Sequence, residues 1–239
     1  MAAEGFWFLV VNDLHHVDDA GLPWLESAFL QMRAHPEHPK FCLLLGDLVE
    51  TASERAFTAV RHLVDHLGMP VHVTAGNHDW TANADRRLFD TFFPEARNHW
   101  FDHEGWQVVV LDSSAGNVYE KVAVPDSSLA WLDATVPKLK PGRPTLLATH
   151  FPLGADVRYR STNADAVLER FKDFDLRAVF SGHFHGLTER RAGDIVLTTN
   201  RCCSTTRKNH DGSLEKGYFL CHAGPNGEVT RRFVQVAGG

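Results

Sequence analysis

The chain has 239 residues, with 24 lysines and arginines against 30 aspartates and glutamates, which gives a formal net charge of −6. A composition of 44% hydrophobic and 23% charged residues is that of a globular protein and excludes a disordered or fibrous chain. The negative balance argues against a nucleic-acid binder that works mainly by neutralising phosphates. No apolar run approaches the roughly 18 residues of a membrane-spanning helix, so we expect no membrane partner.

Cysteine usage and the N-terminus both indicate a reducing compartment. Residues 1–5 carry no basic region and no cleavage site, so we expect no secretory signal. The four cysteines contain no C-x-x-C pair, which excludes a disulfide framework or a zinc ribbon and favours a cytoplasmic protein. The adjacent Cys202 and Cys203 either pack in the core or line the substrate side of a site.

Strands and helices are predicted to alternate in the first third of the chain, within one domain that spans residues 1–239. A capping box at residues 51–54 and a glycine at 68 predict the start and the end of one helix. The predicted elements are a strand at 6–12, a helix at 23–32, a strand at 41–45, a helix at 56–67 and a strand at 71–74. This order predicts parallel strands joined by crossover helices.

The remainder of the chain is predicted to be more antiparallel. Two short runs on either side of the Glu104-Gly105 turn are typical of a hairpin. The predicted elements are strands at 100–102 and 107–111, a helix at 128–136, a strand at 145–148, a helix at 164–171, and strands at 178–180, 187–191, 195–199, 218–222 and 229–236.

Polar clusters follow five of the predicted strands. Ligands of open α/β sheets bind at the carboxyl ends of the strands, so we expect these side chains to converge. Oxygen and imidazole donors without thiolate suit Mn, Fe, Zn, Ni or Co, and seven donors favour two metals that share a carboxylate. The seven donors are Asp13, His15, Asp47, Asn77, His150, His183 and His185.

The residues around the donors give a physical reason for their spacing in the sequence. In Asp13-x-His15 and His183-x-His185, alternation along an extended segment is expected to put both side chains on one face. The glycines at 46, 76 and 182, directly before three of the donors, are expected to let the backbone turn tightly and approach a ligand.

The order of these clusters resembles the calcineurin-like metallophosphoesterase superfamily, whose pattern is D-x-H, G-D-x-x-D, G-N-H-D/E, a lone H and G-H-x-H. The sequence reads Asp13-x-His15, Gly46-Asp47-x-x-Glu50, Gly76-Asn77-His78-Asp79, His150 and Gly182-His183-x-His185. Glu50 departs from the usual Asp, at a position to which the family gives a supporting role outside the metal ligands. The resemblance implies an α/β fold, a four-layer α/β/β/α sandwich with two mixed β-sheets.

The resemblance also implies roles for the donors. Two transition-metal ions, manganese, iron or zinc, would share Asp47. One would be held by Asp13, His15 and His185, and the other by Asn77, His150 and His183. A hydroxide between the ions would attack phosphorus in line while both ions neutralise charge on the phosphoryl oxygens.

Four further residues are expected beside the metals. His78 would reach the phosphate or the leaving group as hydrogen-bond donor or general acid, and Asp79 would orient it. Asn77 and His78, with His16 and Trp80 as neighbours of the motifs, are the expected substrate-binding residues.

The short chain resembles the small phosphodiesterases of this superfamily, which act on cyclic nucleotides, glycerophosphodiesters or similar small-molecule diesters. The alternative is a phosphomonoesterase acting on a nucleotide, a sugar phosphate or a phosphoprotein. An alternative of another class is a non-catalytic scaffold, which predicts substituted metal ligands. A homodimer is the candidate assembly.

Other polar residues carry weaker expectations. His62 and His66 lie four residues apart on a predicted helix and are interpreted as a solvated helix edge without a third ligand. Candidates for contacts with non-reacting parts of a substrate, or else plain surface residues, are Arg158, Arg160, Asn163, Arg201, Arg207, Lys208, Tyr119 and Tyr159.

Overall fold

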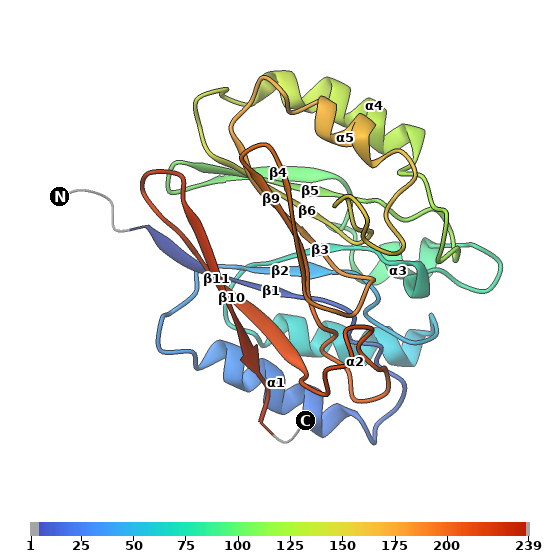
Figure 1. Ribbon diagram of the computed structural model, residues 1–239. Helices are drawn as coiled ribbons and strands as arrows, with labels where there is room; N and C mark the ends of the chain where they lie inside the picture. Colours follow the sequence, from blue (N-terminus) through green and yellow to red (C-terminus); the bar gives the residue numbers. More distant parts are fainter. Residues whose placement is uncertain (1–4, 238–239) are drawn as a thin grey trace.

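The computed structural model describes residues 5–237, and the expectation about a secretory signal falls almost entirely on residues 1–4, outside this range. Two β-sheets lie face to face, and helices cover the outer face of each (Figure 1). The predicted four-layer α/β/β/α sandwich is therefore confirmed.

The first sheet has the strand order β11-β10-β1-β2-β3. Its parallel strands are β1 (Phe6–Val11), β2 (Cys42–Leu45) and β3 (Val71–Thr74), and its antiparallel strands are β10 (Gly217–Ala223) and β11 (Val229–Gln235). The crossover helices α1 (Leu22–Arg33) and α2 (Glu54–Asp65) cover its outer face.

The second sheet has the order β4-β5-β6-β7-β9-β8 and is less antiparallel than expected. Its four central strands are parallel, namely β5 (Trp106–Leu111), β6 (Thr145–Thr149), β7 (Leu176–Ser181) and β9 (Ile195–Thr199). Only the edge strands β4 (His99–His103) and β8 (Thr188–Ala192) run antiparallel to their neighbours. The helices α4 (Asp126–Thr135) and α5 (Ala164–Glu169) supply the crossovers that parallel pairing requires.

Three apolar clusters hold the layers together. One lies between the sheets and contains stacked rings of Phe8 and Phe41, whose centroids are 5.2 Å apart. The other two lie between each sheet and its own helices. Because both faces of the central strands are buried, these strands read as continuous apolar runs.

Short helices account for most of the differences from the expected elements. The helix α3 (Arg87–Phe92) and the 3₁₀ turns Asn77–Asp79 and Val136–Lys138 were not expected, because such short segments show little periodicity. The N-cap of α2 is Ser53, whose Oγ accepts from the Ala56 amide at 3.3 Å, rather than the expected Thr51.

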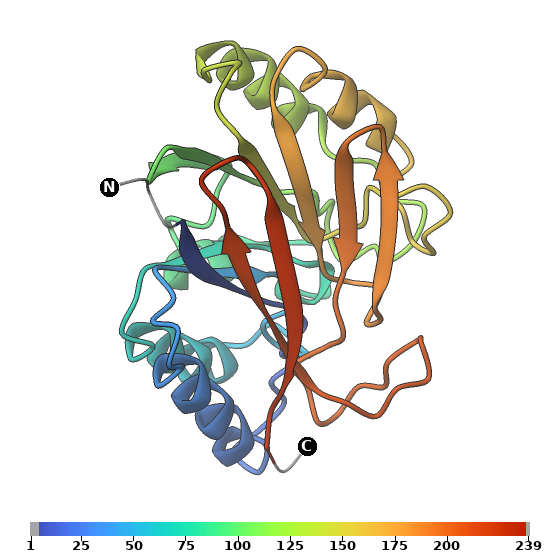
Figure 2. The same cartoon turned by 60° about the vertical axis from the view of Figure 1, so that its left-hand side comes forward.

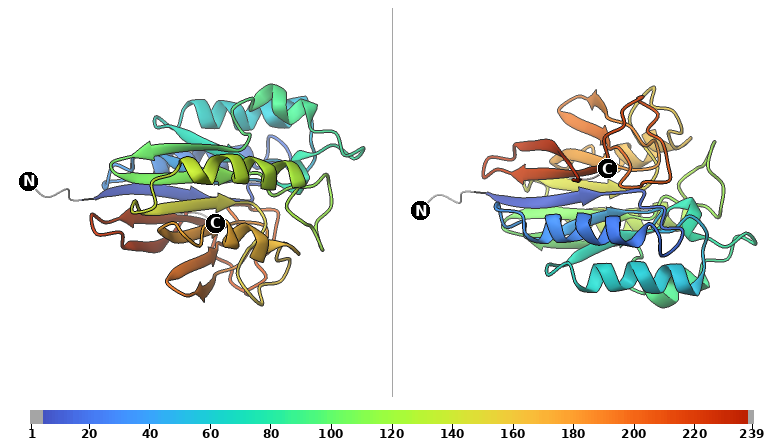
Figure 3. Two further views of the ribbon diagram at one scale, coloured as in Figure 1. Left: turned by 90° about the horizontal axis from the view of Figure 1, so that it is seen from above. Right: turned by 90° about the horizontal axis from the view of Figure 1, so that it is seen from below.

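The parallel strands that precede the donors, β1, β2 and β3 in one sheet and β6 and β7 in the other, end on the same side of the molecule. In both views of Figure 3 the blue strand β1 runs from the side of the N-terminus toward the side where the long loops gather, and antiparallel strands such as β10 run the opposite way. No helix among residues 5–237 is both long and apolar enough to cross a membrane.

Candidate metal centre and substrate cleft

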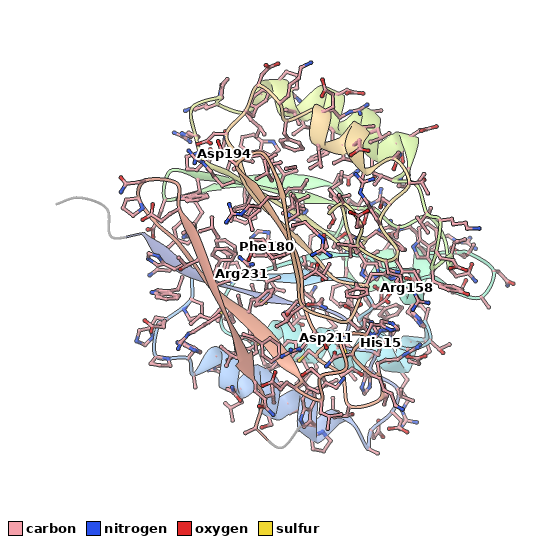
Figure 4. All side chains as sticks on the ribbon, viewed as in Figure 1. His15, Arg158, Phe180, Asp194, Asp211 and Arg231 are labelled. Carbon is pink, nitrogen blue, oxygen red and sulfur yellow. The ribbon has the colours of Figure 1, made fainter. Side chains whose placement is uncertain are left out.

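The structure brings all seven expected donors to one end of the sandwich. Asp13 and His15 follow β1, Asp47 follows β2 and Asn77 follows β3, whereas His150 follows β6 and the last two histidines follow β7. All seven residues are buried: Asp13, His15, Asp47, Asn77, His150, His183 and His185. In Figure 4, His15 lies at this end of the strands among converging side chains.

The backbone at these donors differs from the expected extended chain. Five of them adopt positive φ angles between 44° and 63°, namely Asp13, His15, Asp47, His183 and His185. Simple alternation therefore does not explain why Asp13 and His15, or His183 and His185, share a face. Left-handed residues after β1, β2 and β7 turn these side chains toward the centre, whereas Asn77 after β3 and His150 after β6 do not adopt positive φ.

The three glycines before donors serve close packing as well as turning. A Cβ on Gly76 would lie 2.2 Å from Asp47 Oδ1, and one on Gly46 would lie 2.6 Å from His150 Nδ1. A Cβ on Gly182 would lie 2.9 Å from Asp13 Oδ2. Only Gly46 has a positive φ, of 76°, so the other two are needed for space around the carboxylates and His150.

The donors fall into two groups that share Asp47. The first group contains Asp13, His15, Asp47 and His185, and the second contains Asp47, His150 and His183. Within each group one ligand atom per residue lies within 4.8 Å of all the others. Asn77 adjoins the second group, because its Oδ1 lies 3.3 Å from His150 Nε2.

Outer contacts orient the imidazole rings of the second group. His150 Nδ1 donates to the Leu45 carbonyl at 2.8 Å, and His183 Nε2 donates to the Tyr119 carbonyl at 2.7 Å. The remaining nitrogens, His150 Nε2 and His183 Nδ1, lie 3.2 Å apart and carry lone pairs. Such outer hydrogen bonds fix the tautomer of metal-binding histidines.

The first group shows the same convergence with more charge. His15 Nε2 lies 3.1 Å from His185 Nε2 and 3.6 Å from Asp47 Oδ2, and His185 Nε2 lies 3.3 Å from Asp13 Oδ1. Burial disfavours protonation of His185, but the adjacent Asp13 carboxylate outweighs it and raises the pKa of His185 to about 11. Two buried imidazole nitrogens this close need a shared proton or a cation between them, so the donor set fits a metal ion.

Five of the seven donors, all except Asp13 and His150, line a cleft of about 560 Å³. Its other walls combine aromatic rings with one charged pair. Residues in these walls include Glu50, Thr51, His78, Trp80, Asn117, Tyr119, Tyr159, Arg207 and His210. Trp80 lines the cleft as expected, and its Nε1 donates a hydrogen bond to Ser114 Oγ at 2.9 Å.

Glu50 connects the cleft to the first donor group. Its Oε2 lies 3.0 Å from His15 Nδ1, in a contact that is short but poorly aligned for a hydrogen bond. Its carboxylate also accepts a bidentate pair from Arg207, with Nε to Oε2 at 2.8 Å. Burial opposes ionisation of Glu50, but His15 and Arg207 outweigh it and lower the pKa of Glu50 to about 2.

Asp79 does not orient His78, contrary to expectation. The buried Asp79 carboxylate accepts from the backbone amides of Leu48 at 2.9 Å and Gly76 at 2.8 Å, so it braces the loops that carry the donors. His78 is held instead by the Glu50 carbonyl, which accepts from its Nδ1 at 2.7 Å. Burial and then the nearby Asp47 carboxylate raise the pKa of Asp79.

His16 was expected near the substrate, but it lies behind the donors. Its buried ring lines a separate hollow of about 270 Å³ beside the start of α1, together with Leu14 and Thr206. The reason is that His16 continues beside β2, with its amide bonded to the Leu48 carbonyl at 3.1 Å, and its side chain points away from the cleft.

Several cleft residues carried little or no signal in the sequence. His210 lies on the loop between β9 and β10 and follows no motif, yet its ring centroid is 5.9 Å from that of His185. The Leu45 and Tyr119 carbonyls act through the backbone, which side-chain patterns do not show. Cys202 and Cys203 are fully buried and do not line the cleft.

Comparison with known proteins agrees with the fold and the motifs. A family model described as calcineurin-like phosphoesterase matches residues 6–187, which is more than half of the chain. The chain therefore belongs to the calcineurin-like phosphoesterase family.

The curated relatives are named as phosphodiesterases. A probable cyclic nucleotide phosphodiesterase from Synechococcus sp. is 30% identical over 201 residues, which are 79% of this chain and 74% of the relative. A relative of the same description from Colwellia psychrerythraea is 26% identical over 80% of this chain and 69% of the relative. A glycerophosphodiester phosphodiesterase from Enterobacter lignolyticus is 23% identical over 71% of this chain and 64% of the relative.

Solved structures share the fold at low sequence identity. GAP50, the anchor in the inner membrane complex of Plasmodium, has a TM-score of 0.68 at 16% identity and covers 99% of this chain and 86% of its own. TT1561 of Thermus thermophilus has a TM-score of 0.61 at 14% identity, and the match covers 97% of this chain and 100% of TT1561.

Proposed function

We propose that the protein is a metal-dependent phosphodiesterase that hydrolyses small phosphodiesters of the cyclic nucleotide or glycerophosphodiester type. The observation that carries this proposal is the pair of buried donor groups that share Asp47. The names of the relatives favour a diester over a monoester. A scaffold without catalysis has no need for seven intact donors arranged around one cleft.

In this proposal the donors hold two transition-metal ions. Asp13, His15 and His185 would hold one ion, Asn77, His150 and His183 would hold the other, and Asp47 would be shared by both. Bound ions would supply charge neutralisation at the phosphoryl oxygens and activation of water as the nucleophile.

The chain itself would orient these donors and bind the ester. The Leu45 and Tyr119 carbonyls hold two imidazole rings in the tautomers that leave a lone pair toward the centre. The His78 amide donates to Asp47 Oδ1 at 2.8 Å and so fixes the bridging carboxylate. The His78 ring lines the cleft beside Arg207, and we propose that it contacts the phosphate or the leaving-group oxygen of the bound ester.

The decisive experiment measures kcat/KM for matched monoesters and diesters on the manganese-loaded protein, together with Asp47→Asn. We expect diesters to be preferred and Asp47→Asn to abolish turnover, because the shared carboxylate is lost. Asp194→Asn is the matched control, since Asp194 lies exposed on the β8–β9 hairpin far from His15 (Figure 4).

Near-normal turnover by Asp47→Asn would overturn the two-metal scheme. A strong preference for monoesters would replace the diesterase by a phosphomonoesterase. Elemental analysis should find about two metal ions per chain after reconstitution, and none at all would favour the scaffold.

A second test concerns His78. We expect His78→Ala to lower turnover while the metal content stays near that of the wild type, because the His78 ring belongs to neither of the two donor groups that share Asp47 and holds Asp47 only through its backbone amide. A parallel loss of metal and activity would show that the ring has a structural role.

A further inference from the structure

The loop between β9 and β10, residues 200–216, lies beyond all the sequence motifs and still forms part of the cleft. Figure 2 shows it extending from the lower end of β9 before the chain returns into β10. It delivers Arg207, which is the single lysine or arginine among the described residues that line the cleft.

Internal contacts brace this loop and hold the Arg207 backbone. Lys216 Nζ donates to the Arg207 carbonyl at 2.5 Å and lies 3.1 Å from Cys202 Sγ. Asn209 Nδ2 donates to the Ser213 and Glu215 carbonyls at 3.0 Å and 2.8 Å. Lys216 and Asn209 are both buried, so the position of Arg207 does not depend on surface contacts alone.

The Arg207 side chain is fixed on one edge and open on the other. Nε and Nη2 donate to the Glu50 carboxylate, and Nη2 also lies 3.2 Å from His78 Nε2. Because His78 Nδ1 donates to the Glu50 carbonyl, its Nε2 accepts from Arg207 in this arrangement. Nη1 has no partner among residues 5–237, and the guanidinium lies in the cleft wall.

A guanidinium held in this way is suited to an anionic ester. The arginine guanidinium is a rigid, planar group of N–H donors. Because Nε and Nη2 donate to Glu50, the group cannot rotate freely, and the orientation of Nη1 in the cleft is fixed. We infer that Arg207 contacts the substrate, with Nη1 donating to a non-bridging phosphoryl oxygen beside His78. This inference rests on the proposed function, since it takes a phosphoester as the occupant of the cleft.

The arrangement also assigns a purpose to Glu50. Its carboxylate positions Arg207 on one side and contacts His15 on the other. Glu50 offsets the charge of Arg207, so the pair offers directed N–H donors with no net charge. Recognition then depends on the geometry of the phosphoryl group as well as on its charge.

The test compares Arg207→Gln, Arg207→Lys and Arg207→Ala with the wild type. We expect Arg207→Gln to lower kcat/KM for bis(4-nitrophenyl) phosphate about 10- to 100-fold, the size expected for a charge-assisted hydrogen bond. Affinity for inorganic phosphate, measured by calorimetry on the manganese-loaded protein, should fall in the same direction. Metal content should not change.

Two further arms separate contact with substrate from a structural role. Added guanidinium ion should restore part of the lost kcat/KM of Arg207→Ala and leave the wild type unaffected. Arg55→Gln and Arg55→Ala are matched controls, because Arg55 also pairs with a carboxylate, Asp19, but is exposed outside the cleft. Arg207→Lys keeps the charge and replaces the fork, so it serves if the other variants fail to fold.

The inference is overturned if kcat/KM and phosphate affinity of Arg207→Gln stay within about twofold of the wild type, or if guanidinium restores nothing to Arg207→Ala. Failure of the proposed function has a different signature, namely a wild-type protein that hydrolyses no phosphoester. In that case phosphate binding by the wild type and Arg207→Gln still decides whether Arg207 contacts the anion.

Discussion

Left-handed backbone conformations are the local device that builds the candidate centre. Five donor residues other than glycine adopt positive φ, and each such residue costs on the order of 1–2 kcal/mol. Two of them, Asp13 and Asp47, are aspartates, a type that tolerates this region better than most residues. The histidines at 15, 183 and 185 belong to another type that is enriched in this region, and simple periodicity misjudged the geometry because it assumes an extended chain.

The glycine at 76 allows a sharp test at the scale of single atoms. In Gly76→Ala the new Cβ would lie 2.2 Å from Asp47 Oδ1 and 2.4 Å from the Asp47 amide, so the shared carboxylate has to move. We expect this variant to lose metal binding and most phosphoesterase activity, as measured by elemental analysis and turnover. Gly142→Ala is its control, since a Cβ there meets nothing within 4 Å. Wild-type metal content in Gly76→Ala would contradict the close packing described above.

At the scale of elements, the edge strands β3 and β4 meet through histidines. The His72 ring stacks on Phe101 with centroids 3.7 Å apart, and its Nδ1 lies 3.1 Å from His99 Nε2. Burial, followed by the neighbouring His99 and His103, lowers the pKa of His72 to about 4. Protonation of His72 therefore opposes the contact between the two sheets at this edge.

This contact predicts a loss of stability in mild acid. The folded-state pKa of His72 lies below its unfolded value of about 6.5, so the unfolded chain binds the proton more tightly. The contribution is present above pH 6.5 and is lost as the pH falls toward 4, by about 2 kcal/mol at pH 5. In urea unfolding at pH 7.5 and pH 5, the decrease should be smaller for His72→Gln than for the wild type.

His62→Gln is the matched control for this measurement, because His62 is exposed on α2. Other buried histidines, such as those in the donor groups, add the same acid-dependent background to all three proteins, so the difference between variants isolates His72. An equal decrease in His72→Gln and the wild type would show that this edge does not respond to pH.

At the scale of the molecule, each donor group draws on both sheets. The first combines residues that follow β1 and β2 with His185 after β7, and the second combines Asp47 with His150 and His183 from the other sheet. An ion in either group would therefore tie the two halves of the sandwich together. Because the unfolded chain lacks these groups, metal binding should stabilise the fold.

We expect manganese to raise the melting temperature of the protein. At a free concentration of about 100 times the dissociation constant, each ion contributes about 2.7 kcal/mol, which corresponds to at least about 5 °C for a chain of this size. Magnesium is the control of equal charge, because imidazole-rich sites suit manganese better. The shift should largely disappear in Asp47→Asn, and a shift of the same size in that variant would contradict a shared carboxylate.

The sequence by itself determined most of the strands and longer helices and the identity of the candidate donors. Apolar runs mark the buried strands, and polar residues recur where those strands end, since parallel strands bring their carboxyl ends to one edge. Tertiary structure alone decided the contacts among residues distant in the chain. No local sequence pattern predicts the ion pair between Arg207 and Glu50 or the position of His210 in the cleft. Nor does one predict that His16 points away from the cleft, or that the Asp79 carboxylate accepts from backbone amides. Those outcomes depend on how loops from two sheets pack against one another.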